Sequence, residues 1–312
     1  MPEPLPFTPY SAFLSRCFST KVQKLPIDCG AGCPVRDGSA GTSGCAFCNG
    51  RSFVPSPAGA ILPVSVQLER GKRFYSRQVR GYASVTYLAY FQAGSNTYPP
   101  PADMMPRFEE ALGVPDVGGL VIATRPDCIT TEWTDCLARL SRRAFVMVEL
   151  GVESVSDEVL RSIGRGHDTA ASRRAILALD SCGIPVGVHT ILGLPGETRH
   201  SLLDQARWLS KLPVSTLKLH QLQVLRGSQL GAAYAANPRN VPVLDAPAYV
   251  RLVADYLERL HPRIAIDRFV SQAPPAALIA PRWGLKNDAV TRLVTDELNR
   301  RQSFQGRLLD LL

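Results

Sequence analysis

The stretch KVQKLPIDCGAGCPVRDGSAGTSGCAFC, residues 21–48, decides the fold expected for this chain. It begins with a short run in which apolar and polar residues alternate, as in a β-strand, and continues into a loop rich in glycine, serine and aspartate. This loop carries Cys33, Cys45 and Cys48. Three thiolates can bind three irons of a [4Fe–4S] cluster and leave the fourth iron open to a substrate. A four-thiolate zinc site that also uses Cys29 is the alternative, and the spacing alone leaves it open.

Beyond this loop, β-rich runs alternate with helical patterns. Strands are expected in KVQKLPID (21–28), SVTYLAYFQ (84–92), GGLVIATRP (118–126), FVMVEL (145–150), PVGVHTILGL (185–194) and TLKLHQLQVL (216–225). Helices are expected at 64–79, 104–112, 132–142, 168–182, 199–211 and 247–260. Strand and helix in repeated order are typical of parallel βαβ units with right-handed crossovers.

Six such repeats predict an α/β fold, a partial (β/α)6 TIM-like barrel, over residues 21–225. Residues 1–20 form an N-terminal segment in this interpretation. After Val224 the alternation weakens, so residues 226–312 are expected to form a C-terminal α/β extension packed on the barrel.

Composition narrows the class of protein. The chain has 312 residues, of which 45% are hydrophobic, and no stretch is apolar and long enough to span a bilayer. The N-terminus has no cationic start followed by an apolar core, so we expect a soluble, cytoplasmic protein without membrane attachment. In that compartment the clustered cysteines indicate metal binding or catalysis in place of disulfides. The net charge of +8 favours an anionic partner.

Polar or glycine-rich sequences follow every predicted strand. After the cysteine loop these are QAGSNTY (92–98), TRPDC (124–128), ELGVES (149–154), GLPGET (193–198) and HQLQV (220–224). In parallel α/β folds the chemistry lies at the carboxyl ends of the strands. The six loops therefore predict one site at one mouth of the barrel.

Taken in order, the motifs QAGSNTY, ATRPDC, ELGVES with GRGHD, HTILGLPGE, KLHQLQVLRGS and APRW resemble the YhcC-like family of radical S-adenosylmethionine (SAM) enzymes, relatives of the Elongator catalytic subunit. The resemblance spans residues 21–283. The long Cys-x11-Cys-x2-Cys spacing, in place of the commoner Cys-x3-Cys-x2-Cys, is itself typical of that branch. The family has the partial barrel inferred above from alternation.

The resemblance implies a cofactor pair, a [4Fe–4S] cluster on Cys33, Cys45 and Cys48 and SAM on its open iron. One electron then breaks a C–S bond of SAM and gives methionine and a 5′-deoxyadenosyl radical, which abstracts hydrogen from a substrate. The electron is expected from a donor such as flavodoxin or ferredoxin. The family position of Cys29 is usually glycine, which speaks against the zinc site.

The resemblance implies several SAM contacts that are made by backbone groups or by an aromatic ring. Phe47 is expected against the adenine, with ordinary packing as the alternative. The family's Gly-Gly-Glu segment, whose backbone carbonyls accept from the methionyl ammonium, corresponds here to Gln92, Ala93 and Gly94. Because this sequence has no glutamate in the segment, we expect only the backbone carbonyls to bind the ammonium. Gly193 and the residues up to Glu197 are expected to offer backbone to the adenine, and Glu197 is as likely to orient the loop as to contact the ligand.

Polar side chains complete the expected SAM site. The resemblance puts Glu153 on the ribose hydroxyls and Arg165 on the SAM carboxylate, which a guanidinium grips in two places. The alternative for Arg165 is a side chain that binds the last carbonyls of a helix. His189 is expected to bind ribose or substrate, with a hydrogen-bonded core histidine as an equal alternative.

Substrate contacts are expected from polar groups at the strand ends, namely Asn96, Tyr98, Arg125, Asp127, Lys218 and His220. Two alternatives without substrate contact stay open: Arg125 and Asp127 pair with each other, and Lys218 extends to the surface. Arg268 and Trp283 are expected to come from the extension and close the mouth. For Trp283, packing in the core is the alternative and the commoner use of a single tryptophan.

Two functional classes follow. The first is a radical SAM enzyme that modifies an RNA base, with tRNA as its partner, as the Elongator relatives imply and the basic extension permits. The second is a radical SAM enzyme for a small metabolite or peptide; no cysteine lies beyond Cys182 to hold the auxiliary cluster of peptide-modifying relatives. A zinc-stabilised RNA-binding module is the non-enzymatic alternative, and it would need neither GVES nor GLPGE.

Overall fold

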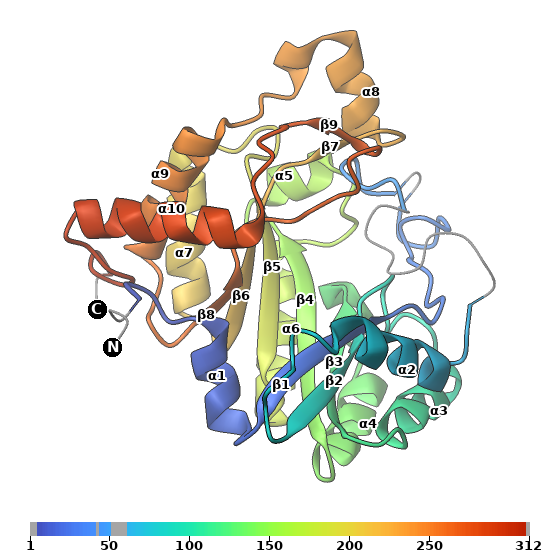
Figure 1. Cartoon of the computed structure of the whole chain (residues 1–312). Helices are drawn as coiled ribbons and strands as arrows, with labels where there is room; N and C mark the ends of the chain where they lie inside the picture. Colours follow the sequence, from blue (N-terminus) through green and yellow to red (C-terminus); the bar gives the residue numbers. More distant parts are fainter. Residues whose placement is uncertain (1–4, 42–43, 51–60, 310–312) are drawn as a thin grey trace.

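The computed structural model describes residues 5–41, 44–50 and 61–309. A seven-stranded sheet in the order β1-β2-β3-β4-β5-β6-β8 curves into a half-barrel, and all its neighbouring strands are parallel. Its strands are β1 (Lys21–Ile27), β2 (Val85–Phe91), β3 (Val117–Thr124), β4 (Phe145–Glu153), β5 (Val186–Leu192), β6 (Thr216–Gln221) and β8 (Ala265–Arg268). Helices pack outside the sheet (Figure 1). The predicted partial TIM-like barrel is confirmed.

The helices of the described ranges are α1 (Tyr10–Cys17), α2 (Val64–Tyr75), α3 (Pro101–Leu112), α4 (Thr131–Ser141), α5 (Asp157–Ser162), α6 (Thr169–Ser181), α7 (Arg199–Ser210), α8 (Gln229–Ala236), α9 (Ala246–Leu257) and α10 (Asn287–Arg300). The six predicted helices are present close to their predicted positions as α2, α3, α4, α6, α7 and α9, and α1, α5, α8 and α10 were not predicted. Side chains of Thr130, Asp168 and Thr198 cap α4, α6 and α7 by accepting from backbone amides. Helix α3 begins before residue 104 because Pro101 suits a first helical turn.

Alternation within the strands creates two different surfaces. Residues such as Leu25, Ile122, Val148 and Leu219 face outward and join the large core beneath the helices. Alternate residues face the interior, where a smaller cluster of Leu88, Tyr90, Val121, Ala123, Met147 and Ala265 contacts Phe13 of α1. Because α1 fills the amino-terminal end of the half-barrel, the interior is left for a site at the carboxyl ends.

Two features of the fold differ from the expectation. Strand β8 comes from the C-terminal extension and pairs with β6, so the sheet continues past the boundary set at residue 225. The run predicted as one strand over 216–225 divides: β6 ends at Gln221, and β7 (Val224–Leu225) pairs antiparallel with β9 (Leu278–Ala280). Both strands were hard to predict because β8 and β7 have four and two residues.

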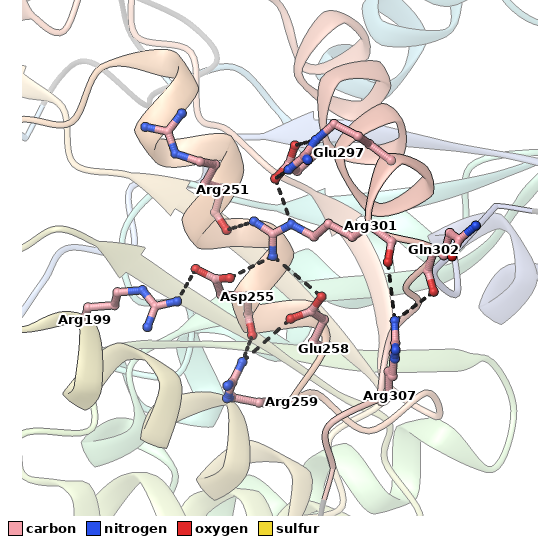
Figure 2. Close-up of polar contacts among 10 residues, drawn as sticks. Arg199, Arg251, Asp255, Glu258, Arg259, Glu297, Arg301, Gln302 and Arg307 are labelled. Carbon is pink, nitrogen blue, oxygen red and sulfur yellow. Dashed lines mark hydrogen bonds and ion pairs between the residues drawn. The ribbon is translucent and has the colours of Figure 1, made fainter.

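Ion pairs stabilise the extension, and one of them, together with a contact to the cysteine loop, holds the extension to the barrel. Arg301 of α10 pairs with Asp255 and Glu258 of the α9 region, and Arg199 of α7 pairs with Asp255 (Figure 2). The amide of Leu230 donates to the carbonyl of Ala46 at 2.9 Å, so the extension also supports the loop between Cys45 and Cys48. None of the helices in the described ranges is both long and apolar enough to cross a lipid bilayer.

Candidate active site

A cavity of about 430 Å³ lies at the carboxyl ends of the strands. Of the residues predicted from the sequence, it is lined by Cys33, Cys45, Phe47, Cys48, Gln92, Ala93, Gly94, Arg125, Glu153, Arg165, His189, Lys218 and His220. Its volume is within the usual range for a small-molecule or cofactor site. The structure thus brings most of the predicted site residues to one place.

The three loop cysteines open onto this cavity as free thiols. Cys45 is buried, and its Sγ accepts from Nη1 of Arg165 at 3.4 Å. The Sγ of Cys48 accepts from the amide of Gly50 at 3.3 Å; burial raises the pKa of Cys48, and this amide opposes the rise. Donors of this kind favour thiolates and are typical of the surroundings of iron–sulfur clusters. The three residues therefore fit a [4Fe–4S] cluster.

Cys29 lies apart from these three cysteines. Its buried Sγ donates to Oδ1 of Asn96 at 3.0 Å, and burial raises its pKa to about 11. Within the described ranges, no group of three or more His, Cys, Asp or Glu side chains is arranged to hold a single metal ion. A zinc site would need four thiolates around one ion, whereas a cluster distributes three thiolates over three irons. The placement of Cys29 does not fit the zinc alternative.

Arg165 forms a buried corner with Gly151 and Glu153. Its Nη2 donates to the carbonyl of Gly151 at 2.6 Å and lies 3.6 Å from Oε1 of Glu153. A β-carbon at Gly151 would lie 2.7 Å from that same Nη2, so a larger residue at this position would displace the guanidinium. The guanidinium faces the cavity and not the last carbonyls of α5, and Nε has no partner in the described structure.

Glu153 has the backbone strain often stored at functional sites. Its φ of 67° is in the left-handed region, next to a register shift between β4 and β5. This geometry turns the side chain toward the cavity. Burial raises the pKa of Glu153, and the charge of Arg165 opposes the rise.

The segment after β2 is packed tightly on the cysteine loop. Gly94 has φ 75°, and a β-carbon there would lie 2.6 Å from the carbonyl oxygen of Gly32. The amide of Ser95 donates to this same oxygen at 2.9 Å. Glycine at 94 is thus required for the two backbones to meet beside the cavity.

The inner wall carries a charged network that sequence reasoning missed in part. Glu149, whose exposed fraction is 1%, accepts from Nζ of Lys218 at 2.5 Å and from Nε2 of His189 at 2.9 Å. Lys218 also donates to the hydroxyl of Tyr90 at 3.0 Å. Burial alone would raise the pKa of Glu149, but the cations Lys218 and Lys24 hold it well below its usual range. Lys218 therefore points inward and does not reach the surface.

Charges within strands could have signalled this network. Lys24 pairs with Asp267 at 2.5 Å, across the opening between β1 and β8. Each of these side chains interrupts an otherwise apolar or alternating run, which indicates an interior polar site when the strands close into a barrel. Glu149 was read as part of ELGVES without a role of its own.

The loop after β5 is organised by Glu197. Its carboxylate accepts from the amides of Gly193 and Leu194 at 3.1 and 3.0 Å and from the hydroxyl of Ser154 at 2.7 Å. These bonds join the ends of β4 and β5. Gly193 does not line the cavity, and Glu197 orients the loop.

Three predicted substrate contacts are directed elsewhere. Asn96 is fully buried and donates to the carbonyls of Phe91 and Ala123, so it holds the loop together. Tyr98 is hydrogen-bonded to Ser39, outside the cavity. Asp127 pairs with Arg125 at 2.8 Å, as the simpler alternative anticipated.

Of the remaining predicted site residues, three line the cavity and one packs in the protein core. Arg125 and His220 line the cavity, and each has a buried nitrogen without a partner in the described structure. Arg268 also lines it, from β8. Trp283 does not close the mouth: it donates to the carbonyl of Leu244 and packs on Tyr249.

Comparisons with known proteins agree with this geometry. The model of the radical SAM superfamily matches residues 30–209, and that of the radical SAM C-terminal domain matches residues 214–300. The chain is 32% identical to the uncharacterized protein YtqA of Bacillus subtilis, covering 95% of this chain and 90% of that protein. It is 31% identical to the protein YhcC of Escherichia coli, covering 86% and 85%.

More distant matches are partial. A tRNA uridine(34) acetyltransferase of Dehalococcoides mccartyi is 29% identical over 54% of this chain and 36% of its own length. Among solved structures, Elp3 of Methanocaldococcus infernus has a TM-score of 0.70 at 13% identity, covering 92% of this chain and 65% of that one, and so shares the fold. The model matches and the full-length relatives show that this chain is a radical SAM enzyme of the YhcC-like family.

Proposed function

We propose that this enzyme cleaves SAM reductively and uses the resulting radical to modify a base of tRNA. The observation that carries the proposal is the cavity itself, in which three free cysteines face Arg165 and Glu153. Cys33, Cys45 and Cys48 would hold the [4Fe–4S] cluster. With SAM bound, this cluster supplies the electron that generates a 5′-deoxyadenosyl radical.

The protein groups then have separate tasks. Arg165 binds the SAM carboxylate through its free Nε and the guanidinium edge, and Glu153 binds the ribose hydroxyls. The backbone of Gln92, Ala93 and Gly94 accepts from the methionyl ammonium, and Phe47 lies against the adenine.

The cavity wall formed by His220 and Gln223 suits a planar, polar substrate. Nε2 of His220 and Oε1 of Gln223 are buried and have no partner in the described structure, although Nε2 of Gln223 already donates to Ser271. Buried polar atoms usually have a partner, so we infer that the substrate supplies one. A flipped base offers such donors and acceptors along its edge. The partial similarity to a tRNA uridine(34) acetyltransferase supports tRNA as the source of the base.

Replacement of Arg165 tests the SAM site. We expect Arg165→Ala to weaken SAM binding by about 2 to 3 kcal/mol, the range for a charge-assisted bidentate contact, while the iron content is kept. Arg165→Lys should recover only part of this, because an ammonium cannot fork. Equilibrium binding of SAM to the reconstituted protein measures the effect. Unchanged affinity in both variants would leave Arg165 with the structural role of holding Gly151.

The RNA partner is tested by the dependence of binding on salt. Arg226 and Arg239 are exposed on the extension, and the carbonyl of Arg226 accepts from Asn49 beside the cysteine loop. We expect tRNA affinity to fall steeply with salt, and Arg226→Glu with Arg239→Glu to reduce the slope of log affinity against log salt by about two. Thermal melting of the variant checks that its fold is kept.

A nucleoside profile extends this test to the cell. Total tRNA from a strain lacking the gene should lack one modified nucleoside found in the parent. An unchanged profile, together with salt-insensitive or absent tRNA binding, would favour a small metabolite or peptide as the substrate.

A further inference from the structure

The surface of α2 and the turn after it carries an unusual concentration of charge. Residues 69–82, ERGKRFYSRQVRGY, contain five cations and one anion. Their net charge of +4 is half of the +8 carried by the whole chain. The stretch belongs to none of the strand-end loops that form the active site.

The arginines of this stretch are all exposed. Arg70 and Arg73 lie on α2 three positions apart, and Arg77 and Arg80 lie in the turn that follows it. In the described structure none of the four makes an ion pair or a side-chain hydrogen bond. Arg199, Arg300 and Arg301 pair with carboxylates in the C-terminal region, and Figure 2 shows the contacts of Arg199 and Arg301.

Aromatic rings lie among these charges. The exposed fraction of Phe74 is 75%, and its ring makes a T-shaped contact with the ring of Tyr75, with the centroids 4.9 Å apart. Tyr82 is 54% exposed, with Nζ of Lys21 over its ring at 5.2 Å. A solvated charged face does not need an exposed phenylalanine at its centre. Arginines interleaved with exposed aromatic rings are typical of surfaces that bind phosphates and stack bases.

The face is also connected to the active-site loop. Gln67 of α2 donates to the carbonyl of Asp28 at 2.7 Å and accepts from the amide of the same residue at 2.9 Å, where β1 leads into the cysteines. Helix α2 packs on β1, the edge strand of the half-barrel (Figure 1). An RNA held on α2 would therefore lie beside the loop that carries the cluster ligands.

We infer that the face formed by Arg70, Arg73, Phe74, Arg77, Arg80 and Tyr82 is a second tRNA-binding surface, which holds the RNA backbone and an unpaired base while another base enters the cavity. This inference rests on the proposed function and extends it, because it adds a binding surface on α2 to the one on the C-terminal extension. Two separated contacts would fix the orientation of the tRNA on the barrel.

The test compares two variants of equal charge change. Arg73→Glu with Arg77→Glu alters the α2 face, and Arg173→Glu with Arg174→Glu places the same change on exposed positions of α6. With total tRNA as the probe, the α2 variant should bind about tenfold or more weakly near physiological salt, and its salt slope should fall by about two. The α6 variant should bind within twofold of the parent.

Phe74→Ala separates stacking from charge. We expect it to weaken tRNA binding about tenfold without changing the salt slope, because a lost ring releases no counterion. All these variants are measured by thermal melting as well, and the exposure of the substituted side chains predicts unchanged stability.

Each outcome has a defined meaning. Equal tRNA binding by the α2 variant and the α6 variant would overturn the inference. If flavodoxin then reduces the α2 variant more slowly than the parent protein, the α2 face would be a binding surface for an acidic protein. If the extension variant weakens binding and the α2 variant does not, the inference fails while the proposed function stands. If the parent protein does not bind tRNA, the proposed function itself fails.

Discussion

Replacement of Cys33, Cys45 or Cys48 by alanine will abolish the iron–sulfur cluster and all SAM cleavage. Anaerobic reconstitution of the parent protein should give close to four irons and four sulfides per chain, by the stoichiometry of the cluster. Each alanine variant should lose most of both and the visible absorbance with them. The reason is that these three thiols line the cavity, where no other cysteine replaces them among the described lining residues.

Cys29→Ala is the matched control. Because the Sγ of Cys29 is bound to Asn96 and its pKa is raised to about 11 by burial, this variant should keep four irons per chain. Loss of iron in Cys29→Ala, or zinc in place of iron in the parent protein, would contradict the assignment of the ligands.

Replacement of Glu149 is expected to have the largest effect on stability. Glu149→Ala leaves Lys218 buried with Asp267 at 3.7 Å as its remaining carboxylate. Loss of one partner from a buried ion pair typically lowers the free energy of unfolding by about 3 to 5 kcal/mol. Chemical denaturation of the apoprotein measures this. Glu69→Ala, which removes an exposed pair with Lys72, should cost less than about 1 kcal/mol.

The same network sets a dependence of stability on pH. The folded pKa of Glu149 lies below its unfolded value of 4.5, so its contribution is complete above pH 4.5 and is lost as the pH falls toward the folded pKa. Glu149→Gln lacks this contribution and should therefore lose less stability than the parent protein between pH 5 and 3. Parallel loss in both proteins would show that Glu149 is not held as a carboxylate by Lys218 and Lys24.

The barrel and the metal ligands could be predicted because both depend on local patterns. Apolar runs such as FVMVEL read as buried strands, and three cysteines in one loop after a strand restrict the chemistry. The strand-end rule then located the mouth without any knowledge of side-chain direction.

The remainder depends on contacts between distant residues. Asn96 follows the second strand as a substrate contact would, but its amide is used by carbonyls of two neighbouring strands. The pairing of Lys24 with Asp267 joins residues 243 positions apart, which no periodicity reveals. Glu153 shows the same limit, because its left-handed backbone and its direction arise from a register shift between strands.

Reductive cleavage of SAM tests the central claim most directly. The reconstituted parent protein, incubated with SAM and dithionite under anaerobic conditions, should form 5′-deoxyadenosine and methionine in equal amounts. Cys45→Ala should form neither, and Arg165→Ala should need much more SAM to reach the same rate. A protein that holds four irons per chain, binds SAM and is reduced by dithionite, yet forms no 5′-deoxyadenosine, would contradict the account.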